Sequence, residues 1–150
     1  MLSVPPRPAP DGKIQLHAST VVVAGAALAF VGPSGTGKSG MALAAMSRGA
    51  VLLADDITWL DRQDDHITAT CPPKLVGRIE ARGIGILSAT PAPPAPLRLI
   101  VDLGLVEPDR LPSARSLNLL GCDVPVLHRS ETPYFIEAIL QYMKAGPAAP

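Results

Sequence analysis

The clearest chemistry in the sequence lies in eight consecutive residues, Gly32-Pro33-Ser34-Gly35-Thr36-Gly37-Lys38-Ser39. They match the pattern G-x-x-x-x-G-K-[ST] at every fixed position, between an apolar run and an Ala- and Met-rich segment. Glycines at this spacing let backbone N–H groups turn inward around a phosphate, and the following helix adds its partial positive charge. Lys38 is expected to reach the terminal phosphates and the Ser39 hydroxyl to bind Mg²⁺. The pattern predicts a site for the phosphates of a nucleoside triphosphate or of pyrophosphate.

Carboxylates that could hold the metal ion or accept a proton follow two apolar runs. Asp55 and Asp56 come directly after Ala50–Ala54, and Asp102 follows Leu97–Val101. Strand geometry continued through the pair would point Asp55 and Asp56 to opposite sides, one toward the phosphate and one toward a second site. Two adjacent carboxylates at the end of a buried strand are costly unless a metal ion or a proton-transfer role uses them. For Asp102, a structural role at the strand end and a metal role are equally open.

The elements that must position these residues are mainly strands. Apolar alternation and short apolar runs predict strands at Ile14–Ser19, Thr20–Ala24, Ala26–Val31, Ala50–Ala54, Ile57–Asp61, His66–Thr70, Leu97–Leu103 and Val124–His128. Helices are predicted at Lys38–Arg48 and at Tyr134–Lys144, the second capped by Thr132 with Pro133 at its first position. His17 lies on the first strand, where a lone histidine is usually structural. The order predicts an α/β domain with a mixed sheet, hairpins and few helices.

Composition excludes several classes of protein. The 13 basic and 13 acidic side chains cancel, so the chain has no global attraction to nucleic acid. Cys71 and Cys122 have no CxxC partner and are expected to be buried free thiols. The longest apolar stretch, Val21–Val31, is too short to span a bilayer, and the N-terminus does not resemble a signal peptide. We therefore expect a cytoplasmic protein that binds neither nucleic acid nor membrane.

The length of 150 residues suits one domain. Residues 1–12 are rich in proline and are expected to form a flexible lead-in. Residues 13–145 are expected to form a single P-loop catalytic domain, and residues 146–150 a tail.

Taken together, these motifs resemble the catalytic domain of the HPr kinase/phosphorylase family. Members of this family act on a serine of HPr, the small carrier protein of the sugar phosphotransferase system. The resemblance covers roughly residues 14–111 and implies a P-loop kinase fold of the type shared with phosphoenolpyruvate carboxykinase. It is carried by His17, Gly25, the Gly32–Ser39 loop, Arg48-Gly49, Ala54-Asp55-Asp56, Ile79-Glu80-Ala81-Arg82-Gly83-Ile84-Gly85-Ile86 and Asp109-Arg110-Leu111.

The resemblance implies catalytic roles for four residues. Asp55 would be the base that takes the serine proton in the kinase direction and returns it when inorganic phosphate attacks phosphoserine. His17 would tune this carboxylate. Arg110 would contact the transferred phosphate, and Lys38 would neutralise charge on it.

The resemblance also implies cofactors and partners. Ser39 and Glu80 would contact Mg²⁺, and Asp56 would lie close to the metal ion. The phosphate donor would be ATP, and the substrate an HPr-like phosphocarrier protein. A homo-oligomer, in particular a hexamer, is expected. The length suggests a short form without the family's N-terminal regulatory domain, like the short forms of alphaproteobacteria.

Two departures from the family pattern leave alternatives open. Gly40 stands where the family usually has Glu, and the late arginine-containing motif linked to the phosphorylase reaction is reduced to Arg129 within Val126–Thr132. One alternative is a P-loop small-molecule kinase, although the chain lacks regular βαβ alternation and a lid helix with R-x-x-x-R spacing. The other is a non-catalytic nucleotide-binding regulator, which the retained acidic residues argue against.

Overall fold

The fold is built on β2 (Ile14–Val23), a long strand whose two halves have different neighbours. In the computed structural model, which describes residues 1–148, its first half pairs antiparallel with β5 (Ile57–Gln63). Its second half pairs antiparallel with β3 (Ala26–Val31) on one side and with β4 (Val51–Ala54) on the other. The two separate strands predicted here are therefore one, because extended backbone continues through Ser19 and Thr20.

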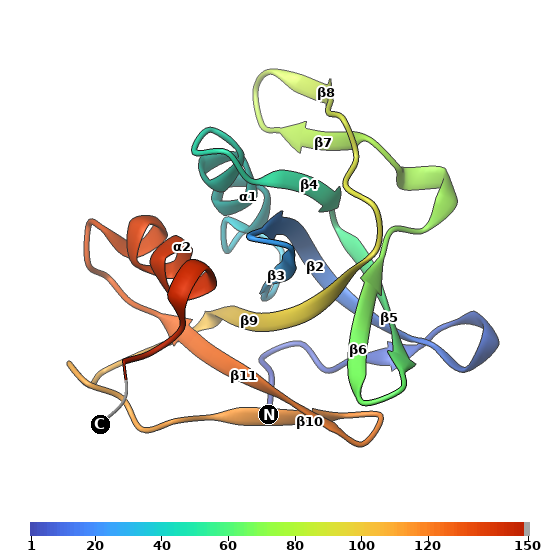
Figure 1. Cartoon of the computed structure of the whole chain (residues 1–150). Helices are drawn as coiled ribbons and strands as arrows, with labels where there is room; N and C mark the ends of the chain where they lie inside the picture. Colours follow the sequence, from blue (N-terminus) through green and yellow to red (C-terminus); the bar gives the residue numbers. More distant parts are fainter. Residues whose placement is uncertain (149–150) are drawn as a thin grey trace.

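The strand pairings close on themselves around β9 (Ala95–Val106). This strand runs parallel to β3 and antiparallel to β6 (His66–Thr70), which forms a hairpin with β5. The pairings β2–β3–β9–β6–β5–β2 thus make a closed circuit (Figure 1). Four further strands of the same sheet lie outside the circuit, namely β1 (Arg7–Pro8), β11 (Cys122–Arg129), which is parallel to β9, its hairpin partner β10 (Ser116–Leu119), and β4.

Two hydrophobic cores lie on opposite faces of β3, which is buried along its whole length. Ala27, Ala29 and Val31 join a core formed by the strands of the circuit together with side chains from β4, β10, β11 and the N-terminal segment. Leu28 and Phe30 face a second core, which contains the helices α1 (Lys38–Met46) and α2 (Phe135–Ala145). Figure 1 shows both helices on the same side of the strands. The predicted mixed sheet with hairpins and few helices is confirmed.

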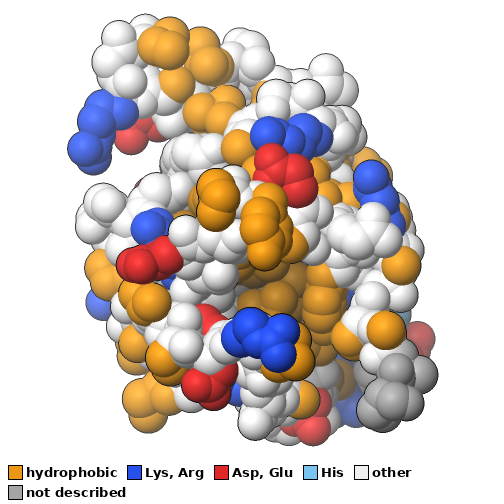
Figure 2. All heavy atoms as spheres, turned by 90° about the vertical axis from the view of Figure 1, so that its left-hand side faces the viewer, with side chains coloured by type: hydrophobic (Ala, Val, Ile, Leu, Met, Phe, Trp, Pro, Cys, Tyr) orange, Lys and Arg blue, Asp and Glu red, His pale blue; other side chains and the backbone are white. Residues whose placement is uncertain are grey.

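A small hairpin stands apart from the main sheet. It consists of β7 (Arg78–Ala81) and β8 (Gly85–Ser88), which pair antiparallel. It lies at the top of Figure 1 and carries hydrophobic side chains on its surface in Figure 2. Two short 3₁₀ turns, Pro10–Gly12 and Pro73–Leu75, complete the regular elements of residues 1–148. The sequence did not predict this hairpin, because glycines interrupt its apolar pattern.

The N-terminal residues differ from the expected flexible lead-in. Leu2 is buried in the strand core, and β1 pairs with Gln15 and Ile14 at the start of β2. Ser3 hydrogen bonds to Asp102. One apolar side chain and one buried carboxylate thus hold a segment that looked unstructured from its prolines. Of the expected tail, residues 149–150 lie outside the described residues.

The start of α2 differs from the prediction, whereas its apolar face agrees with it. The predicted Thr132 cap is wrong, because α2 begins only at Phe135 with Tyr134 as its N-cap, and the Thr132 N–H donates a hydrogen bond to Ser130 Oγ. The predicted apolar face of α2 is confirmed, with Ile136, Ile139, Leu140 and Met143 buried and Phe135 packed against the second core. Cys71 and Cys122 are free thiols, but they are half-buried rather than buried. No helix within residues 1–148 combines the length and apolar character needed to cross a membrane.

Candidate active site

The glycine-rich loop lies between the end of β3 and the start of α1, as its pattern predicts. Gly32 adopts φ +146°, where a Cβ atom would stand 2.8 Å from Thr36 Oγ1 and 3.2 Å from the Gly104 N atom. Any other residue would therefore push the loop off the strand that supports it. Gly37 ends the loop at φ +92° and is the N-cap of α1. The N-terminal N–H groups of α1 accordingly open toward the loop.

Lys38 is folded into this loop. Its side chain is buried, and its Nζ donates hydrogen bonds to the carbonyl oxygens of Gly32 at 2.9 Å and Pro33 at 3.1 Å. Burial lowers the pKa of Lys38 below its ordinary value, and the charges of Asp56 and Asp55 partly oppose this. The loop thus holds a cation close to the position where the phosphate of a P-loop ligand is bound.

Asp55 lies beside the glycine-rich loop and connects three elements through hydrogen bonds. Its carboxylate is 8 % exposed, and its Oδ1 accepts hydrogen bonds from Ser19 Oγ at 2.7 Å and Ser39 Oγ at 2.8 Å. Its Oδ2 accepts the Glu80 backbone N–H at 3.0 Å. Sequence reasoning missed Ser19, although the polar pair Ser19-Thr20 inside an apolar strand was a usable signal. The carboxylate links β2, α1 and β7 in one network.

Asp56 takes a different direction and pairs with His17. Its Oδ1 lies 3.0 Å from His17 Nε2, and the two side chains are 68 % and 37 % exposed. The predicted pairing of His17 with Asp55 is wrong, since His17 contacts Asp56 instead. The reason is that β4 ends at Ala54 and Asp56 adopts φ +69°, so strand alternation does not continue through the acidic pair. His17 lies opposite Ile57 in the β2–β5 register, directly beside Asp56.

These residues line two adjoining pockets. One, of about 520 Å³, brings together Lys38, Ser39, His17, Asp56 and Glu80. The other, of about 300 Å³, is lined by Ser39, both aspartates and Glu80 at the base of the β7–β8 hairpin. Arg82 also lines the larger pocket. The sequence had not indicated a separate role for this cation.

Two predicted residues are not brought to these pockets. Arg110 lies in the exposed segment between β9 and β10 and lines neither pocket. Asp102 is fully buried, and its carboxylate accepts hydrogen bonds from Ser3 Oγ, the Ser3 N–H and the Gly104 N–H at 2.5–2.9 Å. The arginine that does contact the glycine-rich loop is Arg129, whose Nη2 donates a hydrogen bond to the Thr36 carbonyl oxygen.

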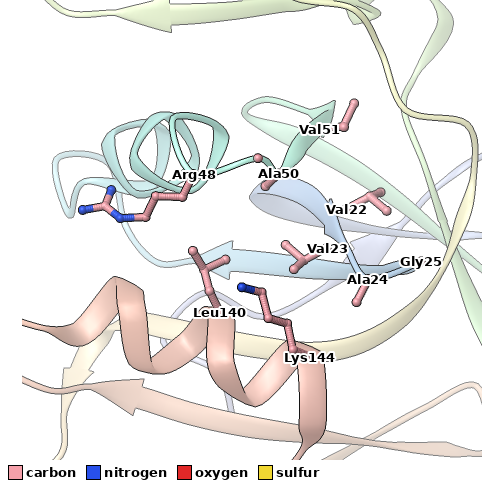
Figure 3. Close-up of a pocket in the computed structure, with 10 residues that line it drawn as sticks. Val22, Val23, Ala24, Gly25, Arg48, Ala50, Val51, Leu140 and Lys144 are labelled. Carbon is pink, nitrogen blue, oxygen red and sulfur yellow. The ribbon is translucent and has the colours of Figure 1, made fainter.

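A further pocket, of about 400 Å³, lies away from the loop between the β2–β3 turn, the end of α1 and α2. Figure 3 shows Leu140 and Lys144 reaching into it from α2 toward Val23. None of its lining residues belongs to the predicted site.

The donor set at the loop fits Mg²⁺. The Ser39 hydroxyl and the Asp55 carboxylate lie within hydrogen-bond distance of each other and offer the hard oxygen ligands that Mg²⁺ prefers. Mg²⁺ usually takes one or two carboxylates together with substrate phosphates and water. Within residues 1–148, no three His, Cys, Asp or Glu side chains are placed so that they could hold a metal ion by themselves.

Comparison with known proteins identifies the family. Residues 11–92 match the family model described as HPr Serine kinase C-terminal domain. The chain belongs to this family. An HPr kinase/phosphorylase of Aromatoleum aromaticum is 39 % identical over 129 residues, which cover 77 % of this chain and 41 % of that protein. An HPr kinase/phosphorylase of an Azoarcus species is 43 % identical over 77 residues, 51 % of this chain and 25 % of that protein.

A solved structure of the family supports the fold. The structure titled Hpr(Ser) kinase/phosphatase from Coxiella burnetii matches with a TM-score of 0.72 at 24 % identity. The match covers 85 % of this chain and 86 % of that one. The chain spans less than half the length of the two curated HPr kinase/phosphorylases described above.

Proposed function

We propose that this chain is the catalytic unit of an ATP-dependent protein-serine kinase that phosphorylates an HPr-like phosphocarrier protein. We further propose that it removes the phosphate by phosphorolysis and so regulates a phosphotransferase system. The observation that carries the proposal is the pocket in which the His17–Asp56 pair lies beside Lys38 and Ser39 of the phosphate loop. Membership of the HPr Serine kinase C-terminal domain family supports the choice of substrate.

The loop would hold the phosphates of ATP. The N–H groups at the start of α1 and the Lys38 ammonium supply positive charge where negative charge develops during phosphoryl transfer. Lys38 would exchange its bonds to the Gly32 and Pro33 carbonyls for phosphate oxygens. Mg²⁺, held through Ser39 and Asp55, would neutralise charge on the phosphates when bound.

The geometry favours Asp56 over Asp55 as the residue that accepts the serine proton. Both oxygens of Asp55 already accept hydrogen bonds, from Ser19, Ser39 and the Glu80 N–H, whereas Asp56 is exposed and lies beside an imidazole. In the forward reaction, the serine oxygen forms a bond to the γ-phosphorus, and the bond from phosphorus to the β-phosphate oxygen breaks. ADP leaves with that electron pair, and the serine proton passes to the Asp56 carboxylate.

The reverse reaction would use the same groups. An oxygen of inorganic phosphate bonds to the phosphoserine phosphorus, the bond to the serine oxygen breaks, and the proton on Asp56 returns to that oxygen. The products are serine and pyrophosphate, which the loop would bind as it binds ATP phosphates.

Assembly and location are part of the same proposal. The chain would act in the cytoplasm as a homo-oligomer, with a hexamer as the specific form. The surface of the β7–β8 hairpin supports assembly, because Ile84 is 77 % and Ile86 57 % exposed there. An exposed apolar surface beside a reaction site is typical of a protein-contact surface.

The test is incubation with labelled ATP, Mg²⁺ and a purified HPr-like protein, followed by addition of inorganic phosphate. Wild-type chain should label one serine and release pyrophosphate on reversal. Asp56→Asn should lower transfer by about 10²–10⁴-fold, the usual contribution of a general base, while retaining ATP binding. Asp55→Asn should instead weaken Mg²⁺-dependent ATP binding. The opposite pattern would return the proton-accepting role to Asp55, and no labelling by wild-type chain would refute the kinase proposal.

A further inference from the structure

Arg129 is joined to the phosphate loop from a distant part of the chain. It is the last residue of β11, 93 positions after Thr36, and its Nη2 donates a hydrogen bond to the Thr36 carbonyl oxygen at 2.5 Å. The same Nη2 lies 3.8 Å from the position that a Cβ of Gly37 would take. The guanidinium therefore rests against the Thr36–Gly37 peptide.

The backbone around Arg129 is fixed on both sides of this contact. His128 pairs with Asp102 in the parallel register of β11 and β9. The Arg129 carbonyl accepts the Glu107 N–H at 2.7 Å. A register shift between His128 and Arg129 occurs at this point, and β11 ends there. The sheet thus presents the guanidinium to the loop from a supported position.

The direction of the contact decides where the Gly37 N–H points. The Thr36–Gly37 peptide is trans, so its C=O and N–H point in opposite directions. The C=O points to Arg129, which does not line the pocket at the loop, whereas Gly37 does line it. The Gly37 N–H therefore faces away from Arg129, on the side where a phosphate would be bound.

We propose that Arg129 is a positioning residue that holds the Thr36–Gly37 peptide so that the Gly37 N–H is directed at a bound phosphate. Arg129 acts behind the loop and has no contact with the reacting atoms. The consequence for function rests on the proposed ATP binding, but the orientation of the peptide is a property of the chain alone.

The experiment compares Arg129→Ala and Arg129→Lys with a matched control, Arg98→Ala. Arg98 also donates one guanidinium hydrogen bond to a backbone carbonyl, that of Met143 at 2.8 Å, but in α2 away from the loop. Three quantities are measured for each folded variant, namely the amide resonance of Gly37 without nucleotide, the Kd for ATP and the Tm.

Arg129→Ala should shift the Gly37 amide resonance and raise the Kd for ATP at least tenfold. Ethylguanidinium at millimolar concentration should restore both, and Arg129→Lys should retain part of the affinity. Arg98→Ala should lower the Tm while leaving the Gly37 resonance and the Kd near wild type.

Two results would overturn the proposal. One is an Arg129→Ala protein with wild-type Gly37 resonance and wild-type Kd. The other is an equal loss of affinity in Arg129→Ala and Arg98→Ala, which would mean a general loss of stability. If Arg129→Ala does not fold, Arg129→Lys with an unchanged Gly37 resonance and Kd gives the same refutation. If wild-type chain binds no ATP, the proposed function fails, and the Gly37 resonance alone decides this inference.

Discussion

Replacing Ser3 by Ala tests how the N-terminal segment is held. The Ser3 hydroxyl donates a 2.5 Å hydrogen bond to Asp102 Oδ1, and the Ser3 N–H donates one to Oδ2 at 2.7 Å. The substitution removes the first bond and leaves the second. It leaves a buried carboxylate oxygen with only the Gly104 N–H as donor.

The expected loss of stability follows from the nature of this bond. A hydrogen bond to a charged group contributes about 1.5–3 kcal/mol. For a domain of this length, each kcal/mol corresponds to about 2–4 °C in Tm. Ser3→Ala should therefore lower the Tm by about 3–12 °C, although Ser3 lies in a segment whose prolines predict flexibility.

Thermal unfolding followed by circular dichroism measures this effect. The control is Ser47→Ala, which removes a hydroxyl bond of 2.7 Å to the Ala44 carbonyl at an exposed position. Changes at such sites usually stay within about 0.5 kcal/mol, so the Tm of this variant should move by less than about 2 °C. If Ser3→Ala had the same Tm as the Ser47→Ala control, the Ser3–Asp102 contact would contribute nothing to stability. The N-terminal segment would then be flexible in solution.

Two further predictions concern the phosphate loop. Gly32→Ala should lower the Tm and abolish ATP binding, because the new Cβ would stand 2.8 Å from Thr36 Oγ1 and the backbone has φ +146°. Thermal unfolding and calorimetric titration measure the two effects. A wild-type Tm together with a wild-type Kd for ATP would contradict this prediction. Burial lowers the pKa of Lys38, so its ammonium is lost as pH rises through a range below that of an ordinary lysine. The affinity for ATP should therefore fall with rising pH, whereas Lys38→Arg, which stays charged, should show no such fall; identical pH profiles would refute the assignment.

Much of the fold was predictable because its signals are local. The apolar runs predicted β3, β4, β5, β6 and β9 to within a few residues at most ends. The ends of α1 and α2 were similarly close. The β7–β8 hairpin was missed, since glycines interrupt it and several of its apolar side chains are exposed. The N-terminal segment was misjudged because its anchors, Leu2 and Ser3, act through contacts with residues far along the chain.

Some residues of the site were predictable from local sequence, whereas their contacts with distant residues were not. The loop residues and the acidic pair were recognisable from their spacing alone. The division between Asp55 and Asp56 was not, because it depends on the left-handed backbone of Asp56 and on the β2–β5 register. Arg110 and Arg129 show the same limit, since spacing along the chain does not tell which arginine approaches the loop.

By itself, the sequence determined that the chain has a glycine-rich loop of the pattern G-x-x-x-x-G-K-[ST], an acidic pair after a buried strand, and enough strands for a mixed sheet. These depend on residue type and on separations of a few positions, which bonded geometry converts directly into local shape. The tertiary structure alone decided that His17 meets Asp56, that Ser19 and Ser39 share Asp55, that Ser3 binds Asp102, and that Arg129 supports the loop. Apart from the Ser39–Asp55 pair, these contacts join residues that are brought together by strand register and sheet closure, and those depend on the packing of the whole chain.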